Sequence, residues 1–346
     1  MIPFVNYKRC YEEHRKEIDK VIKGCLEDGD LILREDVGLF ERNLARFVGM
    51  KYAVGLNSGT DALFLALKAL DIKGEVITTS HTFIATIAAI HNAGATPILV
   101  DIGDDMLMDL SKIRITEKTK AIIPVHLNGD VVDVSELKKI AGDIPIIEDS
   151  AQAIGIPTTD KGTIKCFSFY PAKMLGCYGD GGAIATDSKE IADKIRVWRD
   201  NSQKRLSNGE KVEDNLMEDY GYNSRLDNIQ AAILSVKIKY LNSWIIRRKQ
   251  IVNMYNEGLG LDWNTPQNYI YLSDKRDKLA KYLKKQGIET LIRDQIPNHK
   301  HPSLKLNFNL PNTEQLAKRA IALPLYPELT NKEVNYIIKK IKQYAI

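Results

Sequence analysis

The chain has 346 residues, of which 44% are hydrophobic and 27% charged, a mixture typical of globular proteins rather than disordered chains. It contains no run of 18 apolar residues and its first residues are charged without a signal-peptide core, so we expect a cytoplasmic protein with no membrane partner. The net charge of +4 is too small to indicate nucleic-acid binding. The four cysteines form no CxxC pair, so we expect neither a disulfide framework nor a metal site.

Strands and helices alternate in the first part of the chain. Short apolar runs predict strands at Glu75–Thr79, Thr96–Asp101, Lys120–His126, Ile144–Glu148, Lys165–Phe169 and Gly182–Thr186. Helix patterns occupy Asp61–Leu70, Phe83–Ala93 and Asp133–Ala141. This alternation predicts an α/β fold with a mainly parallel sheet that is flanked by helices.

The C-terminal part has a different pattern. It is predicted to contain helices at Leu226–Leu241, Lys275–Gln286 and Asn331–Tyr344, a strand at Tyr269–Leu272, and a loop at Gln295–Asn312. We therefore predict a large α/β domain with an N-terminal helical segment over residues 1–240, and a small α+β domain over residues 241–346. The smaller domain holds 18 Lys/Arg against 9 Asp/Glu, which indicates either a surface that faces an anionic ligand or a solvated lysine-rich surface.

Short segments near the predicted strand ends could form a binding site. Gly59 and Thr60 start an apolar helix whose free N–H groups suit a phosphate, although an ordinary capped helix has the same pattern. Asp149 ends a buried strand and either faces a ligand or caps the next helix. Lys173 precedes a glycine-rich turn and could form an imine, or be a surface lysine. Phe83 could stack on a planar ring or belong to the core.

Together these residues are the parts that a pyridoxal 5′-phosphate (PLP) site needs. The helix N-terminus would take the phosphate. Asp149 would keep the pyridine nitrogen protonated, and Lys173 would hold the aldehyde as an imine and later move protons. The combination therefore favours PLP as the cofactor.

The sequence also resembles the DegT/DnrJ/EryC1/StrS family of sugar aminotransferases over nearly its whole length. The segments that carry the resemblance are NSGTDALFLAL, EVITTSHTFIAT, GATPILVDI, TKAIIPVHLNG, IIEDSAQAIG, FSFYPAKMLGCYGDGGAIAT, GYNSRLDNIQAAIL and LPLYPELT. The resemblance implies the fold-type-I architecture of PLP-dependent aminotransferases. It also implies an obligate homodimer with shared active sites.

The resemblance further implies roles for individual residues. Lys173 would carry the cofactor, Asp149 would pair with the pyridine nitrogen and Gln152 would lie near the ring hydroxyl. Phe83 would stack on the ring. The phosphate would be bound by Gly59, Thr60 and Ser168, and by Asn223 from the neighbouring subunit. Arg225 would reach into that neighbouring site toward the substrate, and candidates for the substrate diphosphate are Arg34, Arg293, Lys300 and His301.

The lysine segment YPAKMLGCYGDGG and the N-terminal PFVNYK resemble family members that act on 3-keto nucleotide sugars. The implied reaction moves an amino group from L-glutamate to a keto group, at C3, of a nucleotide-linked sugar, in deoxyamino-sugar biosynthesis for lipopolysaccharide or another glycan. Three alternatives stay open: a 4-keto nucleotide sugar, another keto or amino substrate on the same cofactor, and a regulator that keeps the fold without catalysis.

Overall fold

The structure is a computed structural model that describes residues 1–203, 217 and 219–345. Within these residues a row of seven strands forms the central layer: β1 (Tyr52–Leu56), β2 (Glu75–Thr79), β3 (Thr96–Val100), β4 (Thr119–Ile122), β5 (Ile147–Asp149), β6 (Ile164–Ser168) and β7 (Gly182–Thr186). The sheets β3-β2-β4 and β5-β6-β7-β1 are joined by parallel bridges at Ile122–Ile146 and Val125–Asp149. Of these seven strands, β7 alone runs in the direction opposite to the other six, so the predicted mainly parallel sheet is confirmed.

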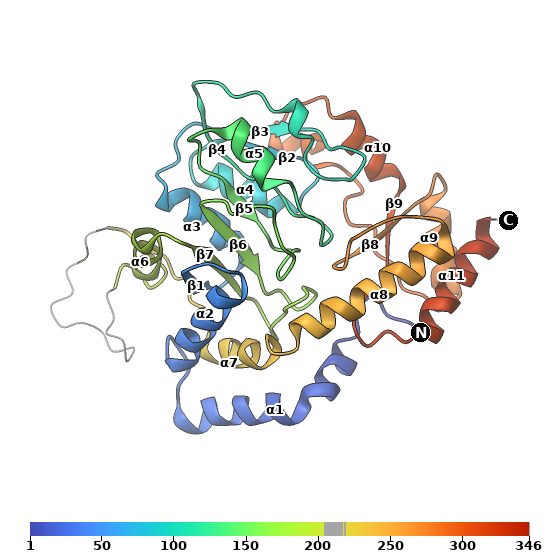
Figure 1. Ribbon diagram of the computed structural model, residues 1–346, viewed down its shortest axis with the longest axis horizontal. Helices are drawn as coiled ribbons and strands as arrows, with labels where there is room; N and C mark the ends of the chain where they lie inside the picture. Colours follow the sequence, from blue (N-terminus) through green and yellow to red (C-terminus); the bar gives the residue numbers. More distant parts are fainter. Residues whose placement is uncertain (204–216, 218, 346) are drawn as a thin grey trace.

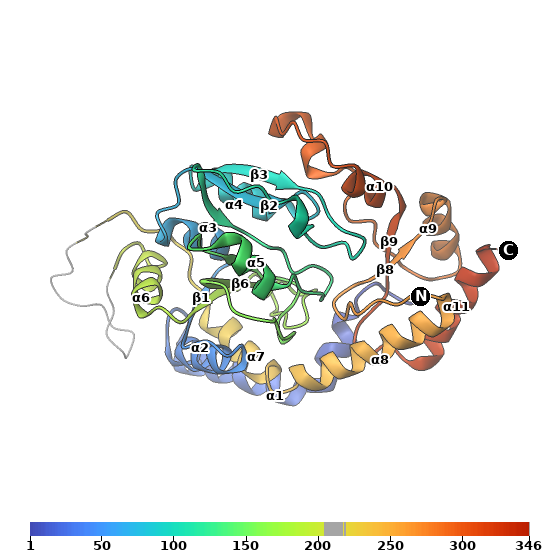
Figure 2. The same ribbon diagram turned by 45° about the horizontal axis from the view of Figure 1, so that its top comes forward.

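Helices cover both faces of this layer (Figures 1 and 2). One face packs against α2 (Glu35–Phe47), α5 (Val134–Ala141) and α7 (Asn228–Lys237), with α1 (Tyr7–Asp28) outside α7, and the other against α3 (Gly59–Ala69), α4 (Ile84–Asn92) and α6 (Lys189–Trp198). Ala183 and Ala185 belong to the core on the α2 side and Ile184 to the core on the α3 side, because successive strand residues point to opposite faces. The strands are therefore buried on both sides.

Local sequence explains where several helices begin and end. Ser58 caps α3 by accepting a hydrogen bond from the backbone N of Asp61 (3.1 Å). Asp133 caps α5 in the same way, and Gly142 ends it with a positive φ of 58°. The predicted helix Leu226–Leu241 is shorter than expected, since α7 ends at Lys237 and α8 (Leu241–Leu259) begins after a turn.

The C-terminal part has a core of its own. It contains α8, β8 (Tyr269–Leu272), α9 (Arg276–Lys285), α10 (Pro311–Arg319), β9 (Ala320–Leu323) and α11 (Asn331–Ala345), and β8 pairs antiparallel with β9. Helix α10 and strand β9 had not been predicted, since one starts in a Pro- and Asn-rich stretch and the other has only four residues. Ile2, from the opposite end of the chain, packs into this core. In the described residues, no helix is both long and apolar enough to cross a membrane.

Candidate active site

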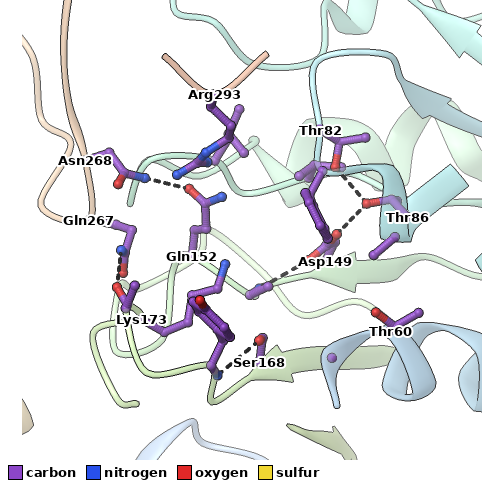
Figure 3. A pocket seen from close by; sticks show the side chains of 18 of the residues that line it. Thr60, Thr82, Thr86, Asp149, Gln152, Ser168, Lys173, Gln267, Asn268 and Arg293 are labelled. Carbon is purple, nitrogen blue, oxygen red and sulfur yellow. Dashed lines mark hydrogen bonds between the residues drawn. The ribbon is translucent and has the colours of Figure 1, made fainter. Parts of the chain in front are cut away.

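A cavity of about 480 Å³ lies at the carboxyl ends of β5 and β6, where open α/β sheets bind their ligands. Its walls come from the starts of α3 and α4, from the turn after β6, and from the C-terminal part (Figure 3). The predicted cofactor residues that line it are Gly59, Thr60, Phe83, Asp149, Gln152, Ser168 and Lys173. The fold thus brings together residues that are more than 100 positions apart in the sequence.

Asp149, the last residue of β5, is buried and held from two sides. Thr86 donates a hydrogen bond from Oγ1 to Oδ2 of Asp149 (2.8 Å), and the Thr86 hydroxyl lies 2.7 Å from that of Thr82. The backbone N of Ala151 donates to Oδ1 (3.2 Å). These contacts fix the carboxylate so that it can face a cationic group in the cavity. The two threonines, at the start of α4, were not predicted from the sequence.

Lys173 lies in the turn after β6, with its backbone N donating to the carbonyl of Tyr170 (2.9 Å). Burial lowers the pKa of the Lys173 amine to about 8; the positive charge of Arg293 acts in the same direction and Asp149 opposes it. About a tenth of the amine is therefore neutral at pH 7, far more than for an exposed lysine. A neutral amine can attack a carbonyl carbon or accept a proton.

The start of α3 forms the opposite end of the cavity. A Cβ atom added to Gly59 would lie 2.7 Å from Cβ of Ser168, so glycine is required where the helix meets the end of β6. The first N–H groups of a helix have no partner within the helix and suit a phosphate. In the described part of the chain, the lysine and arginine side chains that line this cavity are Lys173 and Arg293, and neither comes from α3 or β6.

Phe83 is the residue that precedes α4, and its side chain lines the cavity. It is 60% exposed, whereas the other seven phenylalanines are buried or partly buried. A planar ring bound in the cavity could cover this aromatic face.

The C-terminal part closes the cavity with polar side chains that sequence reasoning missed. Gln267 hydrogen-bonds through its amide to the backbone at Ala172 (3.0 Å) and Met174 (2.9 Å). The Asn268 amide lies 3.0 Å from Oε1 of Gln152 and 3.1 Å from Nη2 of Arg293. Both residues are buried and precede β8. In a single sequence, a Gln-Asn pair after a proline looks like part of an ordinary loop, so nothing marks these two residues as part of a site.

The remaining predicted residues do not line the cavity of their own chain. Asn223 is exposed and forms a bridge with Asp200, and Arg225 pairs with Asp200 (2.9 Å). Arg34 pairs with Asp30 (3.3 Å) at the start of α2. Lys300 pairs with Glu314 (2.9 Å), and His301 lies beside it between two short 3-10 helices. Among the candidates for the substrate diphosphate, Arg293 is the one that lines the cavity.

Residues 12–342 match the DegT/DnrJ/EryC1/StrS aminotransferase family. The chain belongs to this family. It is 37% identical to the pleiotropic regulatory protein of Geobacillus stearothermophilus, over 99% of this chain and 98% of the relative. It is also 37% identical, over the whole of both chains, to dTDP-3-amino-3,6-dideoxy-alpha-D-galactopyranose transaminase of Aneurinibacillus thermoaerophilus. The crystal structure of Streptomyces venezuelae DesV in complex with a ketimine intermediate has a TM-score of 0.93 and 34% identity, and covers 99% of this chain and 98% of that chain.

DegT/DnrJ/EryC1/StrS aminotransferases depend on PLP, so this member of the family is a PLP-dependent aminotransferase. The cavity fits that cofactor. Its Gly59–Ser168 contact leaves no room for a side chain at the helix N-terminus, and Asp149 is fixed by Thr86. Lys173, with its lowered pKa, lines the same cavity (Figure 3). A helix N-terminus, a carboxylate and an amine are thus present in one cavity.

Proposed function

We propose that the protein transfers an amino group from L-glutamate to the C3 keto group of a nucleotide-linked sugar, as a step of deoxyamino-sugar biosynthesis for lipopolysaccharide or another glycan. The observation that carries the proposal is the placement of Lys173, Asp149 and the start of α3 around one cavity. The relative from Aneurinibacillus, which is a sugar 3-amino transaminase by name, supports the choice of C3. The segment YPAKMLGCYGDGG around Lys173 supports it as well. A 4-keto sugar is the second candidate.

In this proposal different cavity residues bind different parts of the cofactor. The backbone at Gly59 and Thr60 and the hydroxyl of Ser168 bind the phosphate. Asp149 keeps the pyridine nitrogen protonated, and the Gln152 amide binds near the ring hydroxyl. Phe83 stacks on the ring and so excludes water from one of its faces.

Bound PLP supplies an electron sink that acidifies the hydrogen on the carbon next to the reacting nitrogen. Lys173 would hold the cofactor through Nζ at rest. As a free amine, Nζ would take the proton from Cα of the amino donor and return it to the carbon on the other side of the reacting nitrogen. Asp149, held by the hydrogen bond from Thr86, would keep the ring nitrogen protonated so that the ring can accept electrons. Arg293 binds anionic groups of the substrates that enter the same cavity.

We further propose that the active protein is a homodimer with shared sites. Among the residues that the structure describes, no cationic side chain lies at the α3 end of the cavity to meet a phosphate dianion, and Asn223 and Arg225 do not line the cavity of their own chain. A partner subunit that placed Asn223 at the phosphate and Arg225 near the substrate would complete the site. We also propose that residues 1–240 form a large domain and residues 241–346 a small one, and that the protein is cytoplasmic. Arg34 and His301 contact the substrate in this proposal.

The function is tested by absorption spectroscopy of the purified protein. A yellow PLP band that bleaches on addition of L-glutamate shows the donor half-reaction. The bleached form is then mixed with 3-keto and 4-keto nucleotide sugars, and we expect the band to return with the 3-keto sugar. Return with the 4-keto sugar alone would move the assignment to the second candidate. A protein that takes up no PLP would instead favour a regulatory role, like that named for the Geobacillus relative.

We expect attachment of PLP to the apoprotein to become faster with rising pH and to level off above about pH 8. Only the neutral amine attacks the aldehyde, and burial and Arg293 lower the pKa of Lys173 to about 8. An exposed lysine would give a midpoint above pH 10. Stopped-flow absorbance at a series of pH values measures this midpoint. A rate that keeps rising above pH 9 would show that the Lys173 amine is not desolvated.

A further inference from the structure

The turn that carries Lys173 is held by one side chain from the C-terminal part of the chain. Gln267 is 6% exposed, and its amide contacts the backbone on both sides of Lys173. Figure 3 shows one of these two hydrogen bonds. Oε1 accepts a hydrogen bond from the backbone N of Met174 (2.9 Å), and Nε2 donates to the carbonyl of Ala172 (3.0 Å). The two bonds need a donor and an acceptor in fixed positions, which an uncharged amide of this length supplies.

Gln267 is itself fixed by a tight turn after β4. The carbonyl of Asn128 accepts hydrogen bonds from the backbone N of Gln267 (2.9 Å) and of Asn268 (3.1 Å), while the backbone N of Asn128 donates to Gln152 (2.9 Å). Asn128 has a φ of 59° and Gly129 a φ of 90°. A Cβ added to Gly129 would lie 2.7 Å from the backbone N of Gln267. The close approach of the two segments therefore depends on glycine at this position.

We infer that Gln267 is a positioning residue for the reaction: it sets the direction in which Nζ of Lys173 points and keeps the amine out of water. Gln267 acts through the backbone of Ala172 and Met174. This inference rests on the proposed role of Lys173 as the residue that attaches PLP. Because Gln267 precedes β8 and Lys173 follows β6, the reacting lysine is in place only when the C-terminal part is seated against the sheet.

The test compares wild type, Gln267→Ala and Gln267→Glu in PLP attachment to the apoprotein as a function of pH. Gln267→Ala removes both bonds and admits water, so we expect attachment about tenfold slower and its pH midpoint raised. Gln267→Glu still accepts from Met174 but adds a negative charge near the ammonium form of Lys173, so its midpoint should lie higher still. Equal pH midpoints in all three proteins, even with lower thermal stability in the variants, would overturn the inference.

A second pair of variants separates positioning from loss of stability. Gly129→Ala displaces the backbone of Gln267, and we expect it to raise the pH midpoint as Gln267→Ala does. Gly94→Ala is the matched control, because Gly94 has a similar φ of 83° and nothing lies within 4 Å of its added Cβ. It should lower the melting temperature and leave the midpoint unchanged. A midpoint that rises equally in both glycine variants would contradict a specific role for Gln267.

The measurement uses PLP alone, without an amino donor or a sugar. A wild type that attaches PLP but does not react with L-glutamate would therefore refute the proposed function and leave the inference on Gln267 intact. Variants that behave as wild type in attachment would refute the inference alone.

Discussion

Lys173→Ala should abolish turnover, with a loss of at least about a thousandfold in the rate of amino transfer. The substitution removes both the amine that attaches the cofactor and the base that moves the proton, and a positioned base alone contributes about 10²- to 10⁴-fold. The loss should appear in the half-reaction with L-glutamate, followed as the decay of the PLP band in a stopped-flow instrument. The phosphate end of the cavity is unchanged, so the variant should still bind PLP without covalent attachment.

Two comparisons make this result specific. Lys73→Ala removes an exposed lysine that pairs with Asp71 at the surface, and it should react as wild type does. Methylamine added to Lys173→Ala supplies a small free amine inside the cavity and should restore part of the rate. Normal turnover by Lys173→Ala would refute the assignment of this lysine and with it the proposed mechanism.

Asp149→Asn should lower kcat by about 10²- to 10³-fold in a protein that remains folded. Asparagine has nearly the volume of aspartate, and its Oδ1 can still accept the hydrogen bond that Thr86 donates (2.8 Å). In the proposed function the substitution removes the negative charge opposite the ring nitrogen, together with the acceptor of the Ala151 N–H (3.2 Å). Leaving one partner of a buried ion pair alone costs about 3–5 kcal/mol. Steady-state kinetics and the visible spectrum of the loaded variant measure the effect.

The control for this prediction keeps the charge and removes its support. Thr86→Val deletes the hydroxyl that donates to Asp149, and we expect a loss of about tenfold, the size of one charge-assisted hydrogen bond. A PLP analogue that is methylated at the ring nitrogen carries a permanent positive charge and should recover part of the Asp149→Asn rate. Equal losses of activity in Asp149→Asn and Thr86→Val would contradict the prediction. They would mean that Asp149 contributes by orienting the bound ring and not by its negative charge.

The parts of the fold that could be predicted from the sequence are those with a local signal. Glu75–Thr79 and Gly182–Thr186 were predicted with their observed bounds, because a short run with apolar residues at successive positions is typical of a strand buried on both faces. Asp133–Ala141 was predicted from its capping aspartate and terminal glycine. Strand β1 was not predicted although it is apolar. It precedes the first predicted helix in the sequence and lies at the edge of the sheet.

Some residues of the candidate site could likewise be predicted from the sequence, and others could not. Asp149 and Ser168 end strands, and Gly59 starts a helix, so their meeting at one edge of the sheet follows from topology. Thr86 and Gln267 have no such signal. Thr86 reaches Asp149 because α4 starts beside β5, and Gln267 reaches the Lys173 turn because Asn128 adopts a left-handed conformation. These contacts depend on tertiary packing, which a single sequence does not encode in any short pattern.

The contacts of Ile2 and Phe4 with the segment around Ile288 have a consequence for the order in which the chain can fold. Ile2 exchanges backbone hydrogen bonds with Gly287 (2.7 Å) and Glu289 (2.9 Å), while Phe4 and Val5 line the cavity. Phe4 and Glu289 are 285 residues apart, a distance that a ribosome takes roughly 15–60 s to translate. The strands of the sheet can pair during that time, but the wall of the cavity that Phe4 and Val5 form cannot yet be held against Glu289. A nascent chain can therefore complete the sheet long before the cavity beside it is closed.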